Sequence, residues 1–269
     1  MESYGQRIDR VENTGSNKSY AQWLASERAF SDRSYGAAPG NLAISPRMLA
    51  KYVKPVEPWD FRQVMASELG DLRGKRVLDF GCGMGEESMY LASMGALVTA
   101  IDISEVGVDL ALQRSEFNCL PIETLVTDCL HSGLPDASFD AVHCLGVIHH
   151  VGLEKGLAEL HRMLKPGGRV VLSEHVSISP FVEKLRARFG SEDTSEDEGP
   201  VPIQDCLSVA EKLGFTVNRT YHFALLYRLR QYWSMLARPW AQKLDYKLLK
   251  LCPPLSEFSG AVVLSLTKR

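Results

Sequence analysis

The strongest constraint on the fold is a regular alternation of strand and helix patterns between Arg76 and His175. Short apolar runs at 76–80, 96–102 and 139–147 predict strands, and the segments between them carry apolar residues at helical spacing. Apolar strands that alternate with helices are typical of a parallel sheet covered by helices on both faces. The pattern therefore predicts an α/β, doubly wound sheet, in which ligands bind at the carboxyl ends of the strands.

The segments on either side of this region predict helical additions. Residues 1–70 contain several runs of helical periodicity, and we expect them to form an N-terminal helical cap. Residues 71–269 would form the second domain, interrupted at 224–258 by an insertion that is helical in period, aromatic and basic. The stretch 191–200 carries five carboxylates and no large apolar residue, which favours a solvated surface loop.

Composition argues against several classes of protein. The 269 residues carry a formal net charge of −3, which argues against a surface that neutralises many phosphates, so we expect no nucleic-acid partner. The six cysteines show no CxxC pair or matched spacing, so we expect neither a metal site nor a disulfide framework, and the chain fits a reducing cytoplasm. No run reaches the ~18 continuous apolar residues of a spanning helix, and the start has no apolar leader.

Three glycines at alternate positions, Gly81, Gly83 and Gly85, follow the first predicted strand in the segment VLDFGCGMGEES. Glycine at this spacing lets a backbone come very close to a ligand. A dinucleotide site holds its pyrophosphate at the N-terminus of the following helix, where unpaired N–H groups attract anions. Glu86 and Glu87 occupy that helix start and would repel a pyrophosphate. A ligand with a cationic centre and a small zwitterionic end is therefore favoured.

Four motifs occur in order along the chain: VLDFGCGMG, VTAIDIS, VTDCLHSGLPDASFDAVHCLGVIHHV and LKPGGRVVLSE. Together they resemble the class I S-adenosylmethionine-dependent methyltransferases of the small-molecule type, over roughly residues 76–175. The resemblance implies a Rossmann-like, seven-stranded sheet that is mostly parallel with an antiparallel last strand. It also implies S-adenosyl-L-methionine as the cofactor and methyl transfer as the activity.

The resemblance assigns the cofactor site to residues at the ends of three successive strands. Asp79 would offset the ammonium group of the cofactor, and Asp102 would accept hydrogen bonds from the ribose hydroxyls. Asp128 would bind the adenine amino group, beside the backbone N–H of Cys129 and the side chain of Ile103. A single Asp at a strand end usually serves a turn, but three at matching positions favour binding. The complete predicted set is Asp79, Gly81, Cys82, Gly83, Gly85, Asp102, Ile103, Asp128, Cys129 and Leu145.

The segment GVIHHV places His149 and His150 at the carboxyl end of the fourth predicted strand, beside the expected methyl group. Methyl transfer is an in-line displacement, and a hydroxyl acceptor must also lose its proton. An imidazole near a sulfonium stays neutral and is a competent base. His150 fits the usual position in the family better and is the first candidate for this base. The alternative is that the two histidines only shape the pocket. Glu174 and His175, at the end of the fifth predicted strand of the parallel series, could contact substrate, but a polar pair exposed to solvent is favoured over a catalytic role.

The expected acceptor is a small molecule, with O-methylation favoured over N- and C-methylation. The fourth strand is not followed by an NPPY-like tetrad, which argues against amino methylation of adenine or glutamine, and RNA is disfavoured by the absence of a compact basic domain. Cap aromatics such as Tyr20, Trp23 and Tyr35 would help to enclose the acceptor, although core packing explains most residues at such spacing. The basic amphipathic insertion is interpreted as a lid in preference to a membrane-contact element.

Two other classes of function stay open. A protein can bind S-adenosylmethionine without methylating, either as a regulatory module or as a scaffold for a different reaction, and intact motifs do not exclude this. A nicotinamide-dependent oxidoreductase is disfavoured by the glycine spacing and by the paired glutamates at 86 and 87. The sequence carries no signal for an oligomeric state.

Overall fold

The computed structural model describes residues 19–37, 41–46, 49, 58–177, 201–226 and 239–269. Its strands are β1 (Arg76–Phe80), β2 (Leu97–Asp102), β3 (Glu123–Val126), β4 (Phe139–Leu145), β5 (Leu164–Ser177), β6 (Val201–Pro202), β7 (Phe215–Phe223) and β8 (Ala261–Lys268). The helices are α2 (Tyr20–Gly36), α4 (Phe61–Leu69), α5 (Glu86–Ser93), α6 (Glu105–Asn118), α7 (Ile148–Val151), α8 (Leu153–Met163), α10 (Ile203–Lys212) and α11 (Pro239–Leu251). Two short 3₁₀ helices, η1 (Cys129–His131) and η4 (Pro253–Phe258), complete the described elements.

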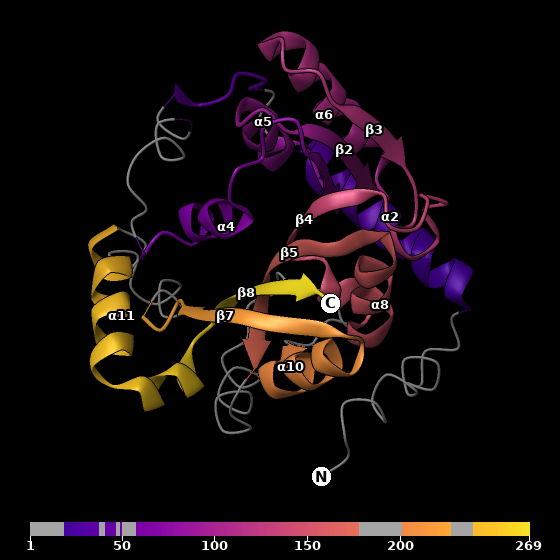
Figure 1. Ribbon diagram of the computed structural model, residues 1–269. Helices are drawn as coiled ribbons and strands as arrows, with labels where there is room; N and C mark the ends of the chain where they lie inside the picture. The colour runs from indigo at the N-terminus through magenta and orange to yellow at the C-terminus, as the bar shows by residue number, and fades with distance from the viewer. Residues whose placement is uncertain (1–18, 38–40, 47–48, 50–57, 178–200, 227–238) are drawn as a thin grey trace.

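A single mixed sheet organises the molecule, with strand order β3-β2-β1-β4-β5-β8-β7 (Figure 1). β1 to β5 pair in parallel, and β8 runs antiparallel to both β5 and β7. The short β6 lies off this path and pairs with β5. The predicted Rossmann-like, doubly wound sheet with an antiparallel last strand is therefore confirmed, with β6 as an addition that the sequence did not predict.

Successive residues of the central strands pack into two hydrophobic cores, one on each face of the sheet. Val77 of β1 packs with residues of α4, α5 and α6, whereas the next residue, Leu78, packs with residues of α8 and α10. Both side chains are fully buried. Because successive side chains of a strand point to opposite faces, apolar residues at consecutive positions bury both faces. This explains why the strands carry continuous apolar runs.

The fourth strand is shorter than its sequence predicts. An apolar run to Val147 suggested a strand of 139–147, but β4 ends at Leu145 and Gly146 follows with a φ of 68°. This left-handed residue turns the chain into the single helical turn α7, which carries both candidate histidines. One of the runs of helical periodicity in the predicted cap, at 46–53, lies mostly outside the described residues. The predicted acidic loop at 191–200 lies entirely outside them.

Gly85 fixes how the chain passes from β1 into α5. It is the N-cap of α5 and has a φ of 77°, in the left-handed region. A Cβ atom at this position would lie 2.5 Å from the Cβ of Ala111 on α6. Glycine is therefore required here twice, for the backbone conformation and for the close approach of α6.

We predict that Gly85→Ala lowers the free energy of unfolding by about 2–4 kcal/mol, because backbone strain and overpacking add. Gly133→Ala is the matched control, since Gly133 also has a positive φ, of 69°, but a Cβ there meets nothing within 4 Å. The control should lose only the backbone part, about 1–2 kcal/mol. Urea unfolding of the three proteins measures both losses, and equal losses would show that contact with Ala111 is unimportant.

Candidate functional site

Asp79, at the end of β1, is 1% exposed and has partners on both carboxylate oxygens. Its Oδ1 lies 2.9 Å from Nδ1 of His143 on β4, and its Oδ2 accepts a hydrogen bond of 2.5 Å from Ser88 on α5. Asp79 thus connects two adjacent strands with α5, the helix that follows the loop of residues 81–85, here called the glycine loop. Its predicted contact with an ammonium group stays a prediction.

The contact with Asp79 changes the pKa of the buried His143. Burial lowers the pKa of His143, but the hydrogen bond and negative charge of Asp79 outweigh burial and raise the pKa above its usual value. A histidine whose pKa is raised in the folded state stabilises the fold below its unfolded-state pKa. This contribution is lost as the pH rises through the folded-state pKa.

We predict that the wild-type protein loses stability relative to His143→Gln as the pH rises above the unfolded-state pKa of about 6.5. Glutamine can still donate a hydrogen bond to Asp79 but cannot titrate, so the difference between the two proteins isolates the proton. Denaturant unfolding at a series of pH values measures this difference. A difference that does not change with pH would mean that His143 folds without binding an extra proton.

The glycine loop is held by Asp102, the acid at the end of β2. Oδ2 of Asp102 accepts a hydrogen bond of 2.8 Å from the backbone N–H of Gly83, and Oδ1 accepts one of 2.9 Å from Ser104. Burial raises the pKa of Asp102, and the two backbone hydrogen bonds partly oppose this effect. The carboxylate therefore fixes the loop relative to β2. Ile103 and Leu145, both predicted pocket residues, are half-buried near these strand ends.

Gly81 shows how tightly this loop is packed. It has a φ of 78°, and a Cβ there would lie 2.3 Å from a methyl carbon of Val147. The two predicted loop thiols are packed as well: Cys82 and Cys129 are both buried, and burial raises the pKa of each thiol well above its usual value. Both therefore remain protonated, which suits packing and not nucleophilic chemistry.

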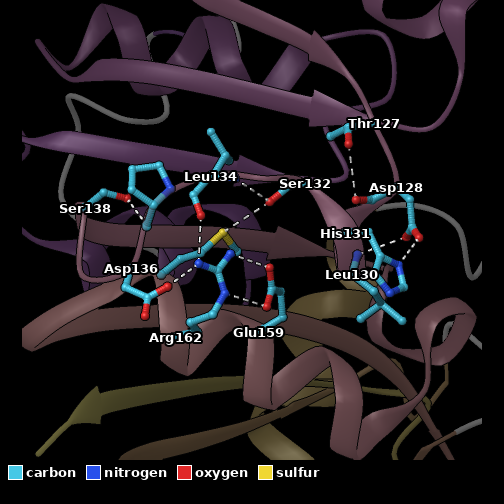
Figure 2. Close-up of polar contacts among 12 residues, drawn as sticks. Thr127, Asp128, Leu130, His131, Ser132, Leu134, Asp136, Ser138, Glu159 and Arg162 are labelled. Carbon is cyan, nitrogen blue, oxygen red and sulfur yellow. Dashed lines mark hydrogen bonds and ion pairs between the residues drawn. The ribbon is translucent and has the colours of Figure 1, made fainter.

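Asp128 lies just beyond β3, where it caps η1. Oδ1 accepts a hydrogen bond of 2.9 Å from the N–H of Leu130, and Oδ2 lies 2.6 Å from Nδ1 of His131 (Figure 2). The hydroxyl of Tyr20 on α2 donates to the same Oδ2 at 2.8 Å. Burial raises the pKa of Asp128, but the hydrogen bonds from His131, Leu130 and Tyr20 outweigh it and lower the pKa. Asp128 therefore remains ionised at neutral pH.

The loop that follows Asp128 is fastened by Arg162 of α8. Figure 2 shows its guanidinium between the carboxylates of Asp136 and Glu159 and the carbonyl oxygen of Leu134. The Nε of Arg162 donates to Glu159 at 2.8 Å, and Nη1 donates to the Leu134 carbonyl at 2.7 Å. Bidentate and charge-assisted bonds of this kind are strong and directional. They hold the part of the loop at Leu134 and Asp136 against α8.

Helix α2 lies against the same strand ends and contributes residues that the sequence did not assign to a polar role. Besides the bond from Tyr20 to Asp128, Asp32 accepts hydrogen bonds from the hydroxyl of Ser104 and, at 3.3 Å, from the N–H of Val106. The hydroxyl of Tyr35 lies 3.1 Å from where a Cβ of Gly83 would stand. Burial and the charge of Asp102 raise the pKa of Tyr35, so its hydroxyl stays protonated.

These contacts hold α2 without help from a hydrophobic core. No residue of α2 whose burial the structure describes is buried, whereas α8 buries five. Most of the stability of a helix comes from burying an apolar face. We infer that α2 opens more readily than the helices packed on the sheet.

We predict that the double variant Tyr20→Phe with Asp32→Ala speeds amide hydrogen exchange in residues 20–36 by about fivefold or more, because each lost hydrogen bond costs about 1 kcal/mol. Exchange in α8 and the global melting temperature should change little. Ser34→Ala, at an exposed position of the same helix, is the control and should leave exchange unchanged. Equal acceleration in α2 and α8 would show that α2 opens only with the whole protein.

The two candidate histidines lie side by side on α7, with ring centroids 4.1 Å apart, but have different partners. Nδ1 of His149 is 2.7 Å from Oε2 of Glu174, whose side chain is 1% exposed. Oε1 of Glu174 accepts hydrogen bonds from the N–H groups of Val147 and Ile148 at 2.9 and 2.7 Å. Glu174, near the end of β5, therefore fixes both the start of α7 and the His149 ring.

His150 contacts α2, whereas His149 contacts β5. Its Nδ1 lies 3.4 Å from Oε2 of Glu27, a longer contact than that of His149. His175 follows Glu174 on β5, and its ring centroid is 6.3 Å from that of His149 in an edge-to-face arrangement. Within the described residues, no group of three or more His, Cys, Asp or Glu side chains could hold a metal ion.

The predicted site residues therefore meet at one edge of the sheet. The ends of β1, β2 and β3 supply the acids and the glycine loop, α7 after β4 supplies His149, and β5 supplies Glu174. A known protein family matches the part of the chain that carries most of these residues. Residues 78–172 match the family described as "Methyltransferase domain".

This segment is a methyltransferase domain. The resemblance predicted from the four sequence motifs is therefore confirmed for it. The match begins within β1 and ends within β5, so the methyltransferase domain contains the glycine loop, Asp102, Asp128 and both candidate histidines.

Two curated relatives are similar over about the same part of the chain. An S-adenosyl-L-methionine-dependent Diels-Alderase, iccD, of Talaromyces variabilis is 36% identical over 106 residues, which cover 38% of this chain and 36% of the relative. A ubiquinone biosynthesis O-methyltransferase of Idiomarina loihiensis is 36% identical over 110 residues, covering 38% of this chain and 43% of the relative. The matched region spans less than half the length of each relative.

Solved structures extend the likeness of fold to most of the chain. The geranyl diphosphate C-methyltransferase of Streptomyces coelicolor A3(2) superposes with a TM-score of 0.63 at 16% identity, covering 94% of this chain and all of that one. At this identity the likeness concerns the fold.

Proposed function

We propose that this protein is an enzyme that transfers a methyl group from S-adenosyl-L-methionine to a small-molecule acceptor, with a hydroxyl oxygen as the favoured acceptor atom. The methyltransferase domain at 78–172 carries the proposal. Residues 1–70 would act as the cap of this enzyme, and 224–258 as an insertion within a catalytic unit of 71–269.

The hydrogen-bond acceptors at the strand ends fit this cofactor. Asp102 presents a carboxylate, which suits the two ribose hydroxyls as donors, and Asp128 presents an ionised acceptor for an exocyclic amino group. The glycine loop, which Asp102 contacts, has no side chain at 81, 83 or 85 and allows a close approach. Glu86 and Glu87 at the start of α5 suit a cationic ligand better than a pyrophosphate.

The bound cofactor would supply the methyl group on a sulfonium, and the chain would supply position and a base. We propose His149, in preference to His150, as that base. Glu174 accepts from Nδ1 of His149, which leaves Nε2 as the nitrogen able to take the proton of an acceptor hydroxyl. Glu174 is a positioning residue in this scheme, since it acts through His149 and through the start of α7.

The acceptor is found by supplying the protein with methyl-labelled cofactor and a metabolite extract, and by searching for labelled products by mass spectrometry. With that acceptor, His149→Gln should lower kcat by about 10²–10⁴-fold, the usual contribution of a general base. Cofactor affinity, measured by calorimetry, should change little. His150→Gln is the comparison variant and should have a much smaller effect on kcat.

Glu174→Gln tests the positioning role through a split between kcat and binding. Because Glu174 acts through His149, kcat should fall while cofactor affinity and the KM for the acceptor stay close to the wild-type values. An equal loss of cofactor affinity would show a general loss of structure instead. An unchanged kcat in His149→Gln, or a larger loss in His150→Gln, would remove His149 from the mechanism.

The similarity to a Diels-Alderase favours one specific alternative, a protein that binds the cofactor but uses it as a scaffold for another reaction. In that case the cofactor would bind with measurable heat, but S-adenosylhomocysteine would not accumulate with any acceptor. Release of S-adenosylhomocysteine in step with a methylated product would reject this alternative. Absence of any binding heat would reject both.

A further inference from the structure

Helix α11 exposes an apolar stripe beside a row of cations. Trp240, Leu244 and Leu251 are 44%, 38% and 82% exposed. At 3.6 residues per turn, these three positions fall within an arc of about 40° on the helix. The exposed lysines at 243, 247 and 250 occupy the adjacent arc of about 60°. Large apolar side chains therefore occupy one half of the outer face of α11, and positive charges occupy the other half.

The opposite face of α11 anchors the helix to the protein. Ala241 and Asp245 are buried, and Oδ1 of Asp245 accepts a hydrogen bond of 2.7 Å from the backbone N–H of Leu226. Asp245 is the one acidic residue in the sequence of α11. The outer face therefore carries positive charge without a carboxylate from its own helix.

The position of α11 in the fold leaves this outer face accessible. Figure 1 shows α11 at the periphery, at the left of the view, beyond α4 and the end of β7. On its inner side α11 contacts β7 and η4. Nζ of the exposed Lys243, in the lysine arc of the outer face, lies 4.8 Å from the ring centroid of Trp59. The 3₁₀ helix η4 adds Phe258, which is 44% exposed.

We propose that the outer face of α11 docks this protein on an anionic lipid membrane surface. An amphipathic helix with Trp and Leu on one side and Lys on the other lies in the plane of the interface, with apolar side chains among the acyl chains and ammonium groups at the headgroup phosphates. None of the described helices is long and apolar enough to cross a membrane. The proposal is independent of the proposed catalytic function.

Charge favours a membrane over a second copy of the chain. A twofold interface through this face would bring two rows of lysines together without facing carboxylates from α11, and like charges oppose such a contact. An anionic bilayer offers both partners that the face requires, an apolar layer and a negative surface.

Co-sedimentation of the full chain with vesicles tests the proposal. We expect binding to vesicles that contain phosphatidylglycerol, little binding to pure phosphatidylcholine, and weaker binding as salt rises. The triple variant Lys243→Glu, Lys247→Glu, Lys250→Glu should lower partitioning by about 100-fold or more, since each lysine contributes about fivefold. The double variant Trp240→Ser, Leu251→Ser should lower partitioning by a comparable factor through loss of the apolar contact.

Matched controls keep the test specific. Phe117→Ser on α6 removes an apolar side chain that is 62% exposed, and Lys212→Glu on α10 reverses an exposed charge elsewhere. Both controls should bind as the wild type does, and circular dichroism should show all variants folded. Absence of binding to anionic vesicles at low salt, equal loss in the controls, or a dimer in sedimentation that is abolished by the α11 variants would overturn the proposal.

Discussion

The buried pair of Asp79 and His143 is the contact on which the geometry of the site depends. It joins β1 to β4 within the sheet, and Ser88 extends the connection to α5. A carboxylate that is 1% exposed is tolerable only with partners on both oxygens, because an uncompensated buried charge costs several kcal/mol. The glycine loop follows β1 and the turn α7 follows β4, so this buried pair links the two strands that carry them.

The parallel part of the sheet was predictable from sequence because its strands are apolar on both faces. Val77 and Leu78 illustrate this, since each is fully buried in a different core. The end of β4 was not predictable in the same way. The run continues through Val147 and Ile148, both buried, and only the positive φ of Gly146 separates strand from helical turn. Hydrophobicity alone does not distinguish these two conformations.

The candidate site shows a similar division. Asp79, Asp102 and Asp128 lie at or just beyond the ends of strands and were visible in the sequence. The role of Tyr20 was not visible, because its partner is 108 residues away. The preference between His149 and His150 also depends on distant residues. Sequence position favoured His150, while the contact of 2.7 Å between His149 and Glu174 comes from a different strand. Pairings across the sheet decide such assignments, and local patterns carry no information about them.

The close approach of Gly85 to Ala111 has a consequence for the variation that this scaffold can accept. A side chain larger than alanine at 111 would meet the loop even if glycine is kept at 85, because the position of a Cβ on Gly85 is only 2.7 Å from the Cα of Ala111. The two positions therefore constrain each other sterically. Substitutions on the face of α6 that packs against Gly85 can therefore alter the loop, as changes within the loop itself do.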